Sequence, residues 1–214
     1  MIVGYRPYLE RIGDLLRNQE LLAFGMRQEV RRCEAALERA EAGARVAIVS
    51  SGDPGVYGMA GLALELAAAR GSVLPIEIVP GVTAANSAAA RLGAPLMLDY
   101  ACVSLSDLLV PWDIVLARVE AVARADLVLC LYNPRSRKRV RQLDEVAALL
   151  LRYRPGQTPV GIATSVGASE ERIELSTLAS FLSCDIGMRS VVIVGNRTTL
   201  RLGPWLVTPR GYAK

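Results

Sequence analysis

The sequence predicts an α/β protein built from two open sheets that are flanked by helices. Two observations carry this prediction. Short apolar runs with β-branched residues alternate with stretches rich in Ala and Leu, and glycine-rich bends stand where a strand should pass into a helix. The pattern changes over residues 96–111, an irregular bridge, so we place one domain at residues 1–103 and a second at 104–214.

The first half alternates helices and strands. Apolar residues on one helical face and a terminating Gly43 predict a helix over residues 28–42. We further expect strands at residues 45–50 and 76–79, and helices at 59–70 and 84–92. Such a domain should begin with a full strand and its loop, but Ile2 and Val3 run directly into Gly4. We therefore expect the first half to lack its leading strand.

In the second half the alternation resumes at Trp112 with a helix that runs to about Ala125. A strand at residues 127–133 should stop at Pro134, and a basic-faced helix should follow to about Tyr153. Further strands are expected at residues 159–166, 172–176 and 190–195.

The two glycine-rich bends are the most informative segments. The first bend is residues 51–58 (SGDPGVYG), and the second bend is residues 81–86 (GVTAAN). Glycine lets backbone approach a ligand closely, and ligands bind at strand ends in open α/β sheets. Neither bend matches the dinucleotide fingerprint or the P-loop. The pair predicts a small-molecule site built from backbone, although turns of this type also occur for geometric reasons alone.

Composition excludes several kinds of chemistry. The 214 residues include no histidine, which removes catalytic triads and imidazole bases. Four well-separated cysteines predict reduced thiols rather than disulfides or a zinc site. We see neither a signal peptide nor an apolar run long enough for a membrane helix, so we expect a cytoplasmic protein with no membrane partner.

A basic run at residues 135–141 places five positive charges among seven residues. It suits either a solvated helix start or a polyanionic partner. Nucleic acid is a weak candidate for that partner, because only 5% of the residues are aromatic and no nucleic-acid-binding motif is present.

Taken together, the motifs resemble the tetrapyrrole (precorrin) methyltransferases of cobalamin biosynthesis. The resemblance spans nearly the whole chain through segments in the family's order: VGY (3–5), GMRQEVR (25–31), SGDPGVYG (51–58), PGVTAAN (80–86), GAPL (93–96), SLSDL (104–108), LYNPRS (131–136), ATSV (163–166) and VGN (194–196). The GMRQEVR and SGDPGVYG segments are typical of the branch that methylates C17 of precorrin-3B or cobalt-factor III.

The resemblance implies a homodimer in which S-adenosylmethionine lies in a cleft between two α/β domains. The implied cofactor contacts are Gly52, Asp53, Val56, Thr83, Ala84, Tyr132, Asn133 and Val166. Arg135 and Lys138, from the basic run, would face carboxylates of the tetrapyrrole substrate. No metal ligand is implied.

The implied reaction is methyl transfer to C17 with ring contraction. Because a sulfonium is an already activated methyl donor, alignment can replace much acid–base catalysis. No catalytic residue can be chosen among the candidates by type, which are Asp53, Asp107, Ser104, Thr164 and Ser165. Methylation of another precorrin carbon, and an inactive homologue that only binds ligand, remain alternatives.

Two departures from the family pattern bear on these expectations. Relatives carry a G-x-G-P-G loop after a first strand, upstream of the segment that opens this sequence, and the sequence does not contain it. This predicts either a start placed too late or a protein without part of its ligand floor. Relatives also commonly have histidine before an aspartate where this chain has Leu98 before Asp99.

Overall fold

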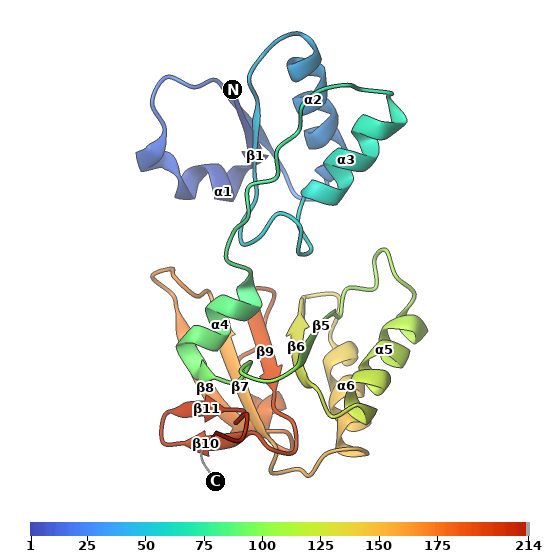
Figure 1. Ribbon diagram of the computed structural model, residues 1–214, viewed down its shortest axis with the longest axis vertical. Helices are drawn as coiled ribbons and strands as arrows, with labels where there is room; N and C mark the ends of the chain where they lie inside the picture. The colour runs from blue at the N-terminus through green and yellow to red at the C-terminus, as the bar shows by residue number, and fades with distance from the viewer. Residues whose placement is uncertain (213–214) are drawn as a thin grey trace. The chain divides into compact units, whose positions relative to one another are not determined.

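In the computed structural model, which describes residues 1–212, the chain divides after Thr83 into a first unit and a second unit (Figure 1). The sequence suggested a boundary after residue 103. The structure instead assigns residues 84–103 to the second unit, because Ala85 and Leu92 belong to a core cluster of the second sheet. The segment also supplies an edge strand to that sheet.

The first unit is a small parallel sheet of strand order β2-β1-β3. Its elements are β1 (Ile2–Tyr5), α1 (Arg6–Arg11), the 3₁₀ turn η1 (Gly13–Leu15), β2 (Leu21–Phe24), α2 (Glu29–Glu41), β3 (Ala47–Val49) and α3 (Ala60–Ala69). Figure 1 shows α1 on one side of the sheet and α2 with α3 on the other. Although we expected no leading strand, Ile2–Tyr5 forms the central one, because both β2 and β3 pair with it.

The predicted strand at residues 76–79 does not form. Within the described chain no backbone hydrogen bond reaches residues 73–80, and Ile76, Ile78 and Val79 are exposed. Pro75 and Pro80 on either side lack the N–H that a ladder needs. The outer edge of β3 likewise pairs with no strand of the described residues. This segment, rich in β-branched residues, therefore has no strand partner in the part of the chain that the structure describes.

The second unit contains a mixed sheet of order β5-β6-β9-β7-β8. The unit comprises α4 (Ala84–Leu92), β4 (Gly93–Ala94), β5 (Tyr100–Ser104), α5 (Trp112–Arg124), β6 (Val128–Tyr132), α6 (Arg141–Leu151), β7 (Pro159–Thr164), β8 (Arg172–Thr177), the 3₁₀ turn η2 (Phe181–Ser183), β9 (Ser190–Val194), β10 (Leu200–Leu202) and β11 (Trp205–Val207). β5 runs parallel to β6, and β9 runs antiparallel to both β6 and β7. The carboxyl ends of β5, β6 and β7 therefore lie along one edge, which we call the carboxyl edge.

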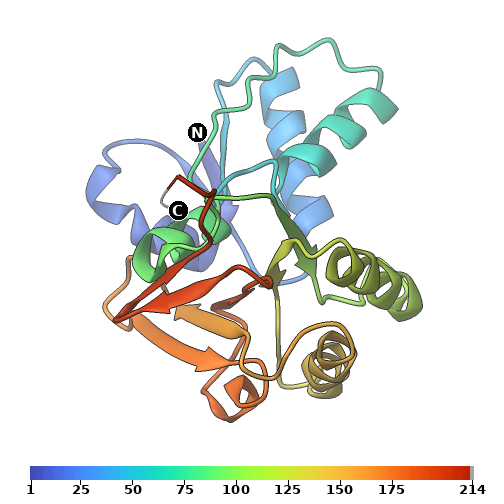
Figure 2. The same cartoon turned by 60° about the horizontal axis from the view of Figure 1, so that its bottom comes forward.

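Helices cover both faces of this sheet (Figures 1 and 2). One cluster joins α5, α6 and η2 to the sheet through residues such as Val119, Leu150 and Phe181. The other cluster joins α4 to the opposite face through residues such as Ala88 and Leu92. β6 and β9 are buried along their whole length, as the continuous apolar runs in their sequence predict.

Several elements differ from the sequence expectations. β5 forms inside the predicted irregular bridge, where β6 supplies a strand partner in register. Helix α6 begins at Arg141, so most of the basic run is loop rather than helix. The short elements α1, β2, β4, β10 and β11 were not anticipated. In the described residues, no helix combines the length and the apolarity that a bilayer crossing requires.

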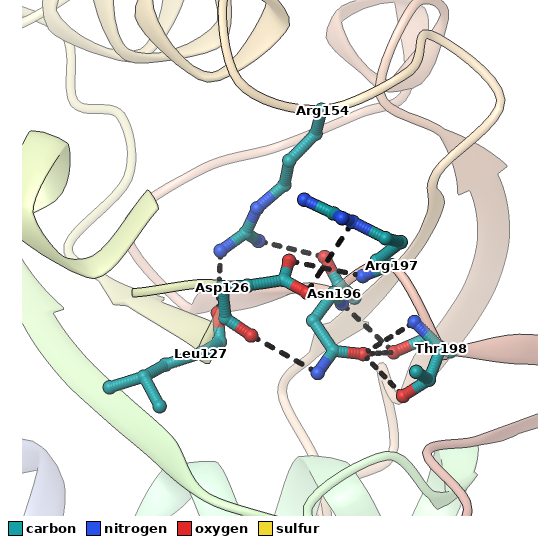
Figure 3. A network of polar contacts seen from close by, with 8 residues as sticks. Asp126, Leu127, Arg154, Asn196, Arg197 and Thr198 are labelled. Carbon is teal, nitrogen blue, oxygen red and sulfur yellow. Dashed lines mark hydrogen bonds and ion pairs between the residues drawn. The ribbon is translucent and has the colours of Figure 1, made fainter. Parts of the chain in front are cut away.

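A buried arginine organises the sheet edge opposite the carboxyl edge (Figure 3). Arg154 is 3% exposed, and its guanidinium donates to the carbonyl oxygens of Leu127 at 2.5 Å and Gly195 at 2.7 Å. Burial lowers the pKa of Arg154, and nearby Asp126 partly opposes that effect. Asn196 extends the network by donating to the carbonyl of Asp126 at 3.1 Å. Arg154 therefore joins the start of β6 to the end of β9.

Candidate functional site

The two glycine-rich bends meet in the first unit through Asp53. The amide of Gly55 donates to Asp53 Oδ1 at 2.8 Å, within the first bend. The amide of Gly81, from the second bend, donates to Asp53 Oδ2 at 3.0 Å. These backbone hydrogen bonds, that of Gly81 first, lower the pKa of Asp53. One ionised carboxylate thus ties together two bends that are far apart in sequence.

The contact between the bends depends on glycine. A Cβ on Gly81 would lie 2.2 Å from the carbonyl oxygen of Gly52, so only glycine permits this approach. Gly52 has a φ of +69° and Tyr57 a φ of +54°, both in the left-handed region. Gly52 and Val56 are exposed. The first bend therefore presents strained, side-chain-poor backbone at the surface, a combination typical of binding sites.

The second bend also reaches the second unit. Thr83 ends the first unit and Ala84 begins helix α4. The amide of Ala85 donates to the phenolic oxygen of Tyr132 at 2.8 Å in a buried position. Tyr132 is the last residue of β6. Tyr132, a predicted contact residue at the end of β6, therefore anchors the start of α4, where the predicted contact residue Ala84 lies.

Asn133 and Val166 follow the ends of β6 and β7 on this carboxyl edge. Asn133 has a φ of +50°, and its side-chain amide donates to Ser104 Oγ, at the end of β5, at 3.0 Å. Ser165 has a φ of +51°, and its Oγ is buried without a hydrogen-bond partner. Val166 packs against the core cluster of α4. Strained backbone therefore occurs at the ends of two strands along one edge.

The basic run divides into residues with different environments. Arg135 forms an ion pair with Asp144 at 2.9 Å, while Lys138 is exposed. Arg139 is 7% exposed and donates to the carbonyl of Asn133 at 2.8 Å. Sequence reasoning singled out Arg135 and Lys138 for the substrate and assigned no role to Arg139. In the structure Arg139 fixes the loop after β6, and Lys138 is the predicted substrate residue with a side chain open to solvent.

The remaining catalytic candidates do not form a proton-transfer constellation. Asp107 accepts a hydrogen bond from Gln142 Nε2 at 2.9 Å, and Thr164 Oγ1 lies 2.7 Å from Ser190 Oγ. Within residues 1–212, no cluster of three or more Cys, Asp or Glu side chains has a metal-binding arrangement. The arrangement suits the binding and orientation of a ligand, and no side chain stands out as an acid or base.

Sequence reasoning missed Arg32 on helix α2. The buried positions of this helix are Arg32, Cys33, Ala36 and Leu37, so an arginine occupies a place in the inward-facing stripe where an apolar residue is expected. That mismatch was visible in the sequence, directly after the GMRQEVR segment.

Comparison with known proteins adds sequence relatives. Residues 1–182 match the family model of Tetrapyrrole (Corrin/Porphyrin) Methylases. The chain is 44% identical over 218 residues to the cobalt-factor III methyltransferase of Priestia megaterium, covering 100% of this chain but only 40% of that protein. It is 44% identical over 212 residues to the probable cobalt-factor III C(17)-methyltransferase of Salmonella typhimurium, covering 99% of this chain and 88% of that protein.

Solved structures share the fold. The methyltransferase CobJ superposes with a TM-score of 0.88 at 39% identity, covering 97% of this chain and 87% of that one. Uroporphyrin-III C-methyl transferase from Thermus thermophilus, complexed with S-adenyl homocysteine, superposes with a TM-score of 0.65 at 22% identity, covering 91% and 79%. The second likeness bears on the fold alone.

Proposed function

Because the chain belongs to the tetrapyrrole (corrin/porphyrin) methylase family, we propose that it transfers a methyl group from S-adenosylmethionine to C17 of precorrin-3B or cobalt-factor III in cobalamin biosynthesis. The names of the relatives from Priestia and Salmonella support this substrate class. The structural observation that carries the proposal is the joint at Asp53, which makes one backbone surface from two bends.

Most of the residues proposed to contact the cofactor would do so through main-chain N–H and C=O groups. Gly52, Asp53 and Val56 lie in the first bend, and Thr83 and Ala84 lie in the second. Tyr132, Asn133 and Val166 lie on the carboxyl edge of the second sheet. The close approach of Gly81 to Gly52 fits a ligand held through main-chain groups, and the unpartnered Ser165 Oγ is a side-chain hydroxyl that a ligand could bond. When bound, S-adenosylmethionine supplies a sulfonium methyl whose C–S bond breaks with the electron pair left on sulfur.

In this proposal Asp53 acts as a loop anchor. Both of its carboxylate oxygens accept backbone hydrogen bonds, which lower its pKa and keep it ionised. A carboxylate so stabilised is a weak base. The chain therefore contributes orientation, and holding two reactants in attack geometry can supply about 7–11 kcal/mol of the barrier.

On the substrate side, the ion pair with Asp144 occupies Arg135. Lys138 is free to approach a carboxylate, whereas Arg135 would have to exchange Asp144 for one. We further propose a homodimer in the cytoplasm, as the family resemblance implies. Sedimentation equilibrium of the purified chain tests the dimer, and a single monomeric species over the micromolar range would reject it.

The activity is tested by incubating the purified chain with S-adenosylmethionine carrying a ¹³C-labelled methyl group and with precorrin-3B or cobalt-factor III in separate reactions. We expect S-adenosylhomocysteine by mass spectrometry and the label on C17 by NMR. If the label were found on another carbon, the chain would methylate that position and the assignment to C17 would be wrong. Ligand binding without any transfer would indicate a binding-only homologue and overturn the proposed activity.

A further inference from the structure

Arg32 is a buried cation without an opposing charge. The residue is 4% exposed, and no Asp or Glu of residues 1–212 lies within ion-pair distance of its guanidinium. Its Nε is also buried and has no hydrogen-bond partner. Removing a charge from water without pairing it is unfavourable, so the contacts that Arg32 does make need an explanation.

Those contacts reach the carboxyl ends of all three strands of the first sheet. Arg32 Nη2 donates to the carbonyl of Gly25 at 3.2 Å, and Nη1 donates to Met59 Sδ at 3.5 Å. The guanidinium carbon lies 5.7 Å from the centre of the Tyr5 ring. Tyr5 ends β1, Gly25 directly follows β2, and Met59 directly follows the first bend after β3.

The shape of the guanidinium explains why arginine serves here. Its planar fork directs two N–H groups at two acceptors while its face rests on an aromatic ring. A lysine ammonium is a point charge and cannot direct two N–H groups at two separated acceptors while it lies over an aromatic ring. The position therefore requires the fork in addition to the charge.

If Met59 moved, the residues of the first bend would have to move with it. Gly58 packs so tightly that a Cβ there would lie 2.5 Å from the carbonyl oxygen of Pro54. The amide of Ala60 donates to that same carbonyl at 3.0 Å. The bend and the start of α3 therefore move together, and Gly52 and Asp53 move with them.

We propose that Arg32 is a positioning residue that fixes the end of β1 and the loops after β2 and β3, and thereby sets the affinity for the S-adenosyl ligand. The affinity part rests on the proposed function, whereas the fixing of the loops does not. Arg32 acts through Gly25, Met59 and Tyr5 and need not touch the ligand.

The test uses Arg32→Lys and Arg32→Met in the full chain, with Arg154→Lys as the matched control. Arg154 is equally buried and donates to backbone carbonyls, but it lies in the second unit on the edge away from the predicted contacts. Three readouts are collected: amide hydrogen exchange without ligand, the melting temperature, and S-adenosylhomocysteine affinity by calorimetry.

Both Arg32 variants should exchange faster than wild type at residues 25–28 and 51–59, and they should bind S-adenosylhomocysteine about tenfold more weakly. Arg32→Met removes an unpaired buried charge, so its melting temperature should stay near that of wild type. Arg154→Lys should melt at a lower temperature but retain its affinity where it is folded.

Unchanged exchange at residues 25–28 and 51–59 in both Arg32 variants would overturn the proposal. So would an affinity loss that Arg154→Lys shares in proportion to its lower melting temperature. If wild type binds no S-adenosylhomocysteine, the proposed function fails, and hydrogen exchange alone decides the role of Arg32.

Discussion

The two units position their predicted contact residues by different means. In the second unit, Tyr132 ends and Asn133 follows a strand that is buried from end to end, between two helix-covered faces. In the first unit, β3 has no fully buried residue, and the bend after it is held by Asp53, by contacts between glycines and by Arg32. A core positions one set of residues, and polar and backbone contacts position the other.

This difference has an energetic consequence. Buried apolar area stabilises a fold without regard to direction, while a few polar contacts give direction with little net stability. The first unit should therefore open more readily than the second. A ligand that binds only its folded form should stabilise it by an amount set by the ligand concentration relative to Kd.

The largest expected effect is the loss of folding stability when a large core side chain is truncated. Phe181 is fully buried in the second unit, so Phe181→Ala should lower the free energy of unfolding by about 3–5 kcal/mol. Leu9→Ala, at the buried residue of α1 in the first unit, should cost about 2 kcal/mol because fewer atoms are lost.

Both tryptophans lie in the second unit, so their fluorescence in urea reports that unit alone, while circular dichroism reports both. Coincident transitions by both probes in wild type would contradict the difference in stability.

Gly81→Ala tests the contact between the bends. Because the new Cβ would meet the backbone oxygen of Gly52, which cannot rotate away, we expect a loss of about 1–3 kcal/mol of stability and weaker binding of S-adenosylhomocysteine. Gly61→Ala is the control, since its Cβ would meet nothing within 4 Å at the start of α3. The control should gain about 0.5 kcal/mol. Equal tolerance of both changes in urea unfolding would show that the bends do not pack as described.

Asp53→Asn tests the carboxylate by its pH dependence. The folded pKa of Asp53 is lowered, so its contribution is complete above the unfolded value of about 3.9 and is lost as pH falls through the lower folded pKa. An asparagine cannot accept both amides with its two ends. The urea midpoint of Asp53→Asn should therefore change less between pH 6 and pH 3 than that of wild type. Asp14→Asn, at an exposed residue, serves as control, and its urea midpoint should change with pH as that of wild type does. If Asp14→Asn reduced the pH dependence as much as Asp53→Asn does, Asp53 would not be its cause.

The smallest effect concerns thiol reactivity in the second sheet. Cys102 and Cys130 are register partners on β5 and β6. A hydrogen bond between the two thiols lowers the pKa of Cys102, and the same contact together with burial raises that of Cys130. Burial also raises the pKa of Cys33 in the first unit. Iodoacetamide at pH 8 should therefore alkylate Cys102 before Cys33 and Cys130, as read by peptide mass spectrometry. Earlier labelling of Cys33 would indicate opening of the first unit.

The sequence predicted the elements that local pattern determines. Continuous apolar runs located β6, β7 and β9, and a helical stripe with a terminal glycine located α2. The strand expected at residues 76–79 fails because a strand needs a ladder partner, which pattern alone does not reveal. β5 was missed for the converse reason, since its partner β6 makes it a strand.

The site followed the same division. The bends and their glycines were visible in the sequence, but the long-range bond from Gly81 to Asp53 depends on tertiary contact. The roles of the basic residues could not be separated either, because only folding pairs Arg135 with Asp144 and buries Arg139.

Hydrogen exchange of the wild-type chain with and without S-adenosylhomocysteine tests the central claim most directly. If the two joined bends and the ends of β6 and β7 hold the ligand, protection should increase together at residues 51–58, 81–86, 132–133 and 166. Saturating ligand that leaves the two bends unprotected, and instead protects residues elsewhere, would contradict the account.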